Sequence, residues 1–277
     1  MIRIEKLGFS YGQVPVLKNI TMNLEPGKIY GLLGENGVGK TTLLTLLAGL
    51  KKPLQGSIDI DGSAPYSRTP QVLENQSYLA DEMLPVPMKA AEYARITGEF
   101  WPNYKQDTFE EIMELFENTS DKKMNEMSTG QLKKTYISLA LALGCRYLFL
   151  DEPTNGLDIP SKAQFRSALM KYTGEDSTIV ISTHQVRDLE NIIDPIIILD
   201  RQDVLLNASL EEISRKLYFD YGTQLHPESL YSEQLPGGFI QVYPNAEGAD
   251  SKVNIEALFN AVHHNKEFIK GLFAETL

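Results

Sequence analysis

Residues 34–42 read GENGVGKTT, and this glycine-rich stretch lies between an apolar run and a helical pattern. The apolar run, residues 29–33, is predicted to be a buried strand, and residues 40–50 are predicted to form a helix. The pattern G-x-x-x-x-G-K-[ST], placed after a strand and at a helix start, is typical of a phosphate-binding loop. The chain is therefore expected to bind phosphate groups where this strand meets this helix.

The residue types of this loop explain how it would hold phosphates. Its glycines let the backbone wrap closely around phosphate oxygens, and the backbone amides of residues 36–41 can point inward. Lys40 is expected to reach the β and γ phosphates as a point charge, and the hydroxyl of Thr41 to hold Mg²⁺. The predicted nucleotide contacts of the loop are Gly34, Asn36, Gly37, Gly39, Lys40, Thr41 and Thr42.

An acidic pair follows another apolar run, in the stretch RYLFLDEP at residues 146–153. The predicted strand delivers Asp151 and Glu152 at its carboxyl end, where ligands bind in parallel sheets. Asp151 is expected to support the Mg²⁺ shell through water, and Glu152 is the candidate general base for the water that attacks the γ phosphate. Alone, such a pair is more often a helix cap or a solvated loop, so its meaning depends on the phosphate loop.

Apolar strands alternate with helical patterns, which predicts an α/β fold with a mostly parallel sheet. Alternating residues near the start of the chain predict an N-terminal antiparallel β subdomain. Residues 89–118 carry two helical patterns split at 100–104, within a helical subdomain inserted at about 82–135. Further strands are expected at 3–7, 16–22, 56–62, 147–150, 177–182 and 195–199, and a helix at 129–143.

The sequence changes in character after residue 217. Residues 218–277 are acidic and contain loop signals, a predicted strand at 239–243 and a predicted helix from 255 to about 271. We expect residues 1–217 to form the main domain and residues 218–277 a small C-terminal α/β element. Two interpretations of this element are open: it only packs on the core, or it regulates it.

The composition argues against some function classes. A net charge of −11 argues against a broad nucleic-acid-binding face, which needs clustered Lys and Arg. The single cysteine, Cys145, cannot form an internal disulfide, which favours a reducing compartment. No window approaches the ~18 uninterrupted apolar residues of a membrane-spanning helix. If the protein works at a membrane, we expect it to dock on something that spans it.

Four further stretches complete a pattern: FSYG at residues 9–12, MSTGQLKK at 127–134, NGLD at 155–158 and ISTHQ at 181–185. Their order around the phosphate loop and the acidic pair resembles that of the ATP-binding cassette ATPases, over about residues 1–217. The stretch 127–134, here called the signature stretch, is the most diagnostic, because simple phosphate-loop enzymes lack it.

The resemblance implies roles for residues outside the loop. Tyr11 is expected to stack on the adenine, with Val16 packing nearby; the alternative for Tyr11 is a core tyrosine in a hairpin. His184 is expected to hydrogen-bond the γ phosphate and to orient Glu152 and the attacking water. These roles make ATP and Mg²⁺ the expected cofactors and ATP hydrolysis the expected reaction.

The resemblance also implies that two chains act together. Ser128, Gly130 and Gln131 match the family signature, which contacts the γ phosphate held by the other subunit. The usual Gly-Gly pair is Thr129-Gly130 here, and we expect function to survive this change. Asp158 is expected at the dimer seam, in a head-to-tail dimer with a second copy or a close paralogue.

Two functions are compatible with such a cassette. The favoured one is the motor subunit of a membrane transporter with a separate permease, bound through that permease to the cytoplasmic face of the cell membrane and without a nucleic-acid partner. The other is a soluble cassette protein acting on ribosomes or DNA. Residues 100–117 and the short C-terminal element resemble bacterial type 2 exporter ATPases, which favours export; an importer or a gliding-associated assembly ATPase is the alternative.

One position departs from the family pattern. In SYLADEML, residues 77–84, Asp81 stands where the family usually has a glutamine that joins the Mg²⁺ shell. Asp81 keeps an oxygen ligand for a hard cation, but on a shorter stem and without an amide donor. We therefore predict that it contributes to the metal site; the alternative is a solvated loop residue.

Overall fold

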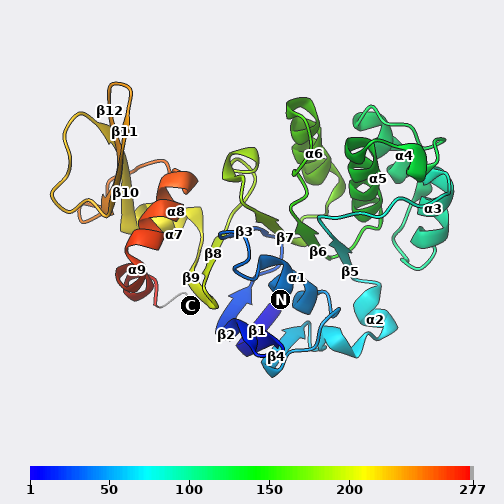
Figure 1. Cartoon of the computed structure of the whole chain (residues 1–277), viewed down its shortest axis with the longest axis horizontal. Coiled ribbons are helices and arrows are strands. Elements are labelled where there is room, and N and C mark those ends of the chain that lie inside the picture. The colour runs from blue at the N-terminus through cyan, green and yellow to red at the C-terminus, as the bar shows by residue number, and fades with distance from the viewer. Residues whose placement is uncertain (275–277) are drawn as a thin grey trace.

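The computed structural model describes residues 1–274, so the last three residues of the predicted C-terminal element lie outside the described part. A central sheet has the strand order β5-β6-β7-β3-β8-β9, and only β8 and β9 pair antiparallel. The predicted α/β fold with a mostly parallel sheet is confirmed (Figure 1). The strands are β3 (Ile29–Leu33), β5 (Gln76–Leu79), β6 (Tyr147–Asp151), β7 (Thr178–Thr183), β8 (Ile196–Asp200) and β9 (Asp203–Ala208).

The strands of this sheet are buried on both faces, because their alternate residues pack into two separate hydrophobic cores. In β6, Leu148 and Leu150 face the core that contains α5 (Thr129–Ala142) and α6 (Ile159–Tyr172). Tyr147 and Phe149, which alternate with them, face the other core together with α1 (Lys40–Leu47). A sheet covered on both faces reads as continuous apolar runs, which is why the sequence identified β3 and β6.

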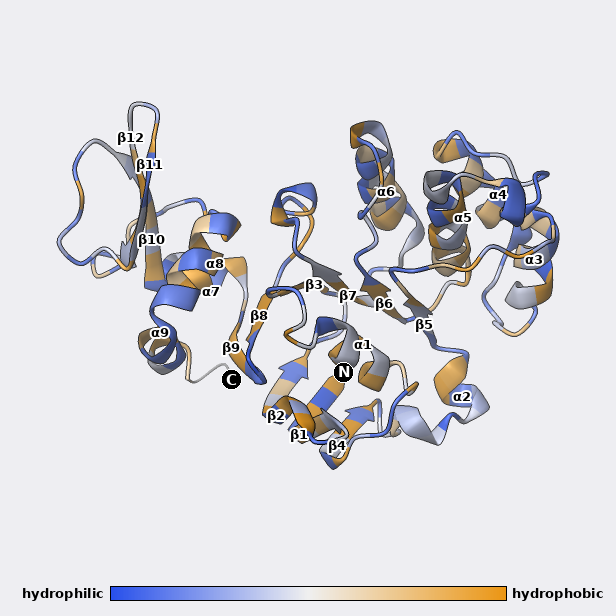
Figure 2. Cartoon of the chain, viewed as in Figure 1, coloured by the Kyte–Doolittle hydropathy of each residue, from blue (hydrophilic) through white to orange (hydrophobic). Residues whose placement is uncertain are grey.

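An antiparallel sheet with the order β2-β1-β4 lies against the other side of α1, as predicted for the N-terminal subdomain. Its inward residues, such as Ile2 and Ile4, are buried and alternate with exposed ones. Figure 2 shows this alternation as orange and blue bands along the strands. The strands are β1 (Ile2–Tyr11), β2 (Val14–Leu24) and β4 (Gln55–Ile60).

Helices gather beyond the β5 edge of the central sheet (Figure 1). The break predicted at residues 100–104 separates α3 (Ala90–Gly98) from α4 (Gln106–Leu115), and α5 packs on both. A short helix, α2 (Pro70–Leu73), precedes β5. Within residues 1–274, no helix combines the length and apolar character that crossing a membrane requires.

The C-terminal element adjoins the β9 edge, at the opposite end of the sheet. The single helix predicted at 255–271 is wrong, because the chain breaks at Asn265 into two helices. The side chain of Asn265 donates to the carbonyl of Leu230 at 2.6 Å, and its backbone leaves the helical region (φ −130°, ψ 46°). Helix α7 (Leu210–Lys216) precedes this element, and β10 (Leu217–Gly222) begins at the predicted boundary. The further segments are β11 (Tyr231–Leu235), β12 (Gly238–Pro244), α8 (Ile255–His264) and α9 (Lys266–Leu272).

Candidate active site

The phosphate loop joins β3 to α1. Gly37 and Gly39 have φ angles of 82° and 113°, in the left-handed region that favours glycine. A Cβ atom at Gly39 would lie 2.9 Å from a methyl group of Val16, so the β2 strand closes directly on the loop. The structure thus places Val16 beside the loop, and its packing near the adenine stays a prediction.

Lys40 begins α1 and is almost fully buried in the loop. Its ammonium group donates to the carbonyls of Gly34 at 2.7 Å and Glu35 at 3.1 Å, and lies 3.8 Å from Oε1 of Glu152. Burial lowers the pKa of Lys40, while the carboxylates of Glu152 and Asp151 act in the opposite direction. The loop carbonyls therefore hold this charge inside the glycine-rich loop.

Three side chains converge on the carboxylate of Asp151 at the carboxyl end of β6. Thr41 Oγ1 donates to Oδ2 at 2.7 Å, Ser182 Oγ to Oδ1 at 2.5 Å, and the Tyr78 hydroxyl to Oδ2 at 3.4 Å. Burial, followed by the charge of Asp151, raises the pKa of Tyr78, so its hydroxyl stays a donor. The result is a fixed carboxylate beside a helix-start hydroxyl.

Glu152 is held through its backbone and its side chain. Its φ angle of 45° is unusual for a residue with a side chain. Its amide donates to Ser182 Oγ at 3.0 Å, and its carbonyl accepts from Lys133 Nζ at 2.8 Å. Its carboxylate lies 2.9 Å from Nδ1 of His184 and 3.8 Å from Nζ of Lys40. The two predicted catalytic side chains around Glu152 thus meet on its carboxylate.

Tyr11 lies at the surface near the start of α1. Its ring is 48% exposed, packs edge-on against Phe9 and lies 5.1 Å below the ammonium of Lys51. Its hydroxyl is 3.3 Å from Oγ1 of Thr42. The alternative interpretation as a core tyrosine is wrong, because an aromatic face remains open beside the loop.

The signature residues lie at the N-terminus of α5. Ser128 and Gln131 form a capping box: the Gln131 amide donates to Ser128 Oγ at 3.2 Å, and the Ser128 amide to Gln131 Oε1 at 3.1 Å. A Cβ atom added at Gly130 would lie 3.9 Å from the carbonyl oxygen of Gly156, so these two residues are close together. The signature stretch and the residues that follow the acidic pair are therefore neighbours.

Asp158 caps the next helix, α6. Its carboxylate accepts from the amide of Ser161 at 3.0 Å, and the hydrogen bonds from Ser161 lower the pKa of Asp158. Ile159, which follows it, is 84% exposed. A charged cap and an open apolar side chain thus project from the surface next to the signature stretch.

Asp81 is engaged by two other side chains. Lys133 Nζ donates to its Oδ1 at 2.9 Å, and Asn155 Nδ2 lies 3.3 and 3.4 Å from its two oxygens. The alternative of a merely solvated residue does not fit these contacts. A metal-ligand role is compatible with these donors, because Lys133 holds Oδ1 and Oδ2 keeps a lone pair for a cation.

Sequence reasoning missed four residues of the site. Tyr78, Lys133, Asn155 and Ser182 all lie inside stretches that were singled out for other residues. The sequence signal for these four residues was that they lie within those motifs. The residues that they contact, Asp151, Glu152 and Asp81, are distant from them in the sequence.

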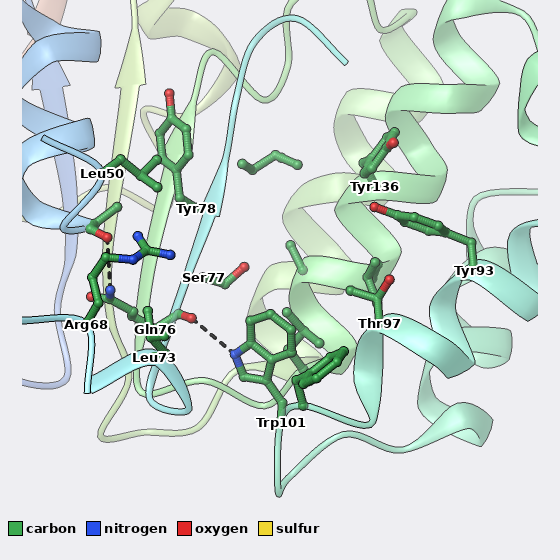
Figure 3. Close-up of a pocket in the computed structure, with 16 residues that line it drawn as sticks. Leu50, Arg68, Leu73, Gln76, Ser77, Tyr78, Tyr93, Thr97, Trp101 and Tyr136 are labelled. Carbon is green, nitrogen blue, oxygen red and sulfur yellow. Dashed lines mark hydrogen bonds between the residues drawn. The ribbon is translucent and has the colours of Figure 1, made fainter. Parts of the chain in front are cut away.

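A groove of about 550 Å³ separates the helical subdomain from the β5 edge. Tyr78 borders it from the strand side and Tyr93 and Tyr136 from the helices, as Figure 3 shows. Trp101 closes one end by donating to the carbonyl of Gln76 at 3.2 Å. Phe100 also lines this groove, and its side chain is 74% exposed. This groove is aromatic and open.

Comparison with known sequences identifies relatives of one kind. The family model described as ABC transporter matches residues 17–155. An uncharacterised ABC transporter ATP-binding protein, YdbJ of Bacillus subtilis, is 30% identical over 76% of this chain and 70% of its own length. The uncharacterised protein MJ1023 of Methanocaldococcus jannaschii is 29% identical over 84% and 88%. The bacitracin transport ATP-binding protein BcrA of Bacillus licheniformis is 28% identical over 78% and 72%.

Solved structures share the fold. A structure described as the ATP-binding subunit of an ABC transporter has a TM-score of 0.69 and 22% identity, covering 78% of this chain and 92% of that one. The dimeric cassette MJ0796, in a post-hydrolysis state bound to ADP and Pi, has a TM-score of 0.67 and 22% identity, covering 76% and 99%. At this identity the likeness concerns the fold alone.

Proposed function

This chain belongs to the ABC transporter family as an ATP-hydrolysing subunit, and we propose that it drives export through a separate permease in a bacterial membrane. The observation that carries the chemistry is the position of Glu152, whose carboxylate lies between His184 at 2.9 Å and Lys40 at 3.8 Å. A buried base between a histidine and a phosphate-binding lysine suits the activation of water beside a γ phosphate.

The proposed mechanism assigns one role to each of these side chains. Glu152 accepts the proton of the attacking water. His184 fixes the orientation of the Glu152 carboxylate through Nδ1. Its Nε2, which lies 3.3 Å from Nε2 of Gln185, exchanges this contact for the γ phosphate. Lys40 exchanges its bonds to the loop carbonyls for phosphate oxygens, where its charge compensates the charge that develops during transfer.

Thr41 and Asp151 fit a magnesium ion. Their oxygens lie 2.7 Å apart at the helix start, and Mg²⁺ prefers oxygen ligands while keeping several waters. When bound, the ion neutralises charge on the β and γ phosphates. Asp81 is a further ligand in this proposal, through Oδ2, while Lys133 holds Oδ1.

We propose a head-to-tail dimer with a second copy or a close paralogue. In it, Ser128, Gly130 and Gln131 of one subunit contact the γ phosphate held by the other, and Asp158 lies at the seam. The exposed capping box at the start of α5 supports this role, because a helix N-terminus attracts anions. The open face of Tyr11 stacks on the adenine, with Val16 packing beside it.

In this proposal the permease docks on the groove of Figure 3, and the subunit works at the cytoplasmic face of the membrane. An open aromatic groove with exposed Phe100 suits an apolar protein segment. The resemblance of residues 100–117 to bacterial type 2 exporter ATPases supports the exporter branch rather than an importer, and the similarity to BcrA, a bacitracin transport ATP-binding protein, is compatible with it.

Transport in inverted membrane vesicles tests this function. We expect the subunit to co-purify with a permease of about six apolar spans, encoded by a neighbouring gene. ATP outside such vesicles should drive cargo inward, which corresponds to export from the cell, and Glu152→Gln should abolish it. ATP-driven movement in the opposite direction would favour the importer, and co-purification with ribosomes or DNA instead would overturn the transporter proposal.

A further inference from the structure

Lys133 on α5 has a buried ammonium group with acceptors in two distant segments. Its side chain is 6% exposed. Nζ donates to the carbonyl of Glu152 at 2.8 Å, to Oδ1 of Asp81 at 2.9 Å and to the carbonyl of Asp81 at 3.5 Å. One side chain of the signature helix therefore joins the loop after β5 to the end of β6.

These contacts meet the requirements for a buried charge. An ammonium group out of water is costly unless it is paired and hydrogen-bonded. Lys133 has one carboxylate and two carbonyls, and Asn155 adds a second donor to Asp81 at 3.3 Å. Removing the ammonium would leave the Asp81 carboxylate with Asn155 as its remaining side-chain donor and the Glu152 carbonyl without this bond.

The Glu152 peptide is the sensitive end of this link. Its φ angle of 45° lies in a region that few residues with side chains occupy. Ser182 fixes its amide at 3.0 Å, and Lys133 fixes its carbonyl at 2.8 Å. The orientation of this peptide determines the direction in which the Glu152 side chain points. The ammonium of Lys133, which holds the peptide, therefore helps to position the base.

We propose that Lys133 is a positioning residue that fastens the Glu152 peptide and the Asp81 loop to the signature helix. It lies about one and a half helical turns after Ser128. A movement of the helical subdomain is thereby transmitted to the general base without any contact between Lys133 and the nucleotide. This inference rests on the proposed role of Glu152 as that base.

Steady-state ATPase kinetics of Lys133→Met test the link, with Lys134→Met as the matched control. Lys134 is the next residue on the same helix and also donates to a backbone carbonyl, that of Phe116 at 3.1 Å. Because a hydrogen bond from a charged group is lost next to the base, we expect kcat to fall about tenfold, with KM for ATP within about twofold of wild type. Lys134→Met should keep both values. Equal kcat for the two variants would overturn the inference.

A double-mutant cycle separates positioning from general loss of packing. If Lys133 acts partly through Asp81, then Lys133→Met combined with Asp81→Asn should lower kcat by less than the product of the two single effects. Full multiplication of the effects at saturating Mg²⁺ would show that the two side chains act independently, against the proposed link.

Hydrogen exchange tests the link without relying on hydrolysis. In the nucleotide-free subunit, amides of residues 80–84 and 152–156 should exchange faster in Lys133→Met than in Lys134→Met. Unchanged exchange in both segments would reject the link. Wild-type turnover in Glu152→Gln, together with faster exchange in Lys133→Met, would instead reject the proposed base and leave the link intact.

Discussion

Glu152 contacts Lys40, the proposed phosphate-binding cation, and His184, which is proposed to orient it. Replacing Glu152 should therefore separate ATP binding from ATP hydrolysis. Glu152→Gln keeps the size of the side chain and removes the charge that accepts a proton. We expect kcat to fall by about 10²-fold or more, the usual contribution of a general base, while ATP binding persists. An ATP-bound dimer should therefore accumulate, which size-exclusion chromatography with ATP detects. Normal turnover in this variant would show that another group is the base.

Asp81 contacts Lys133 and is also a proposed metal ligand, and the metal dependence of activity tests the second role. If its carboxylate joins the Mg²⁺ shell during turnover, Asp81→Ala should raise the Mg²⁺ concentration for half-maximal activity, and the response to Mn²⁺ should differ. Asp81→Gln, which restores the usual family residue, should lie nearer to wild type. Identical metal titrations for both variants and wild type would leave Asp81 only its contact with Lys133.

At the residue scale, the order of the motifs was enough to predict that the charged groups lie close together. Lys40, Asp151 and Glu152 follow strands whose carboxyl ends meet at one edge of the sheet, so their proximity follows from a parallel topology. The contacts of Lys133 did not follow from it. They depend on how α5 packs beside β5 and β6, and a lysine on a helix is normally a solvated residue.

At the element scale, prediction worked where burial leaves a pattern. The β6 strand is buried throughout and reads as a continuous apolar run. In β11, by contrast, every residue is exposed or half-buried, so no periodic signal exists. The break between α8 and α9 is also invisible, because it depends on the bond from Asn265 to Leu230, a contact that forms only in the folded chain.

Helix capping gives a test at this scale that is independent of catalysis. Asn254 precedes α8 and accepts from the amide of Ala257 at 2.9 Å. Asn254→Ala removes the acceptor of that amide and should lower the free energy of unfolding by about 1 kcal/mol. Asn254→Ser keeps a side-chain acceptor and should retain most of the stability of the wild-type protein. Chemical denaturation of the three proteins measures this difference. Equal stability of the Ala and Ser variants would mean that the cap contributes nothing.

At the scale of the whole molecule, Cys145 reports on the integrity of the core. Burial raises the pKa of its thiol to about 12, with a hydrogen bond from Trp101 acting in the opposite direction. At pH 8 the folded protein therefore holds almost no thiolate, and the group is inaccessible as well. We expect iodoacetamide to label Cys145 slowly in the native protein and rapidly in denaturant. Fast labelling of the native protein would contradict this burial.

The C-terminal element and the helical subdomain lie at opposite ends of the sheet, yet one hydrophobic core includes residues of both. Leu258 on α8 is fully buried in that core, and Trp101 packs against it from the other end. Leu258→Ala should lower the free energy of unfolding by about 2–5 kcal/mol. If unfolding is cooperative across the sheet, this change shifts both Trp101 fluorescence and Cys145 labelling to lower denaturant concentration. Transitions of Trp101 and Cys145 that stay at the wild-type midpoint would instead show that the C-terminal element unfolds by itself.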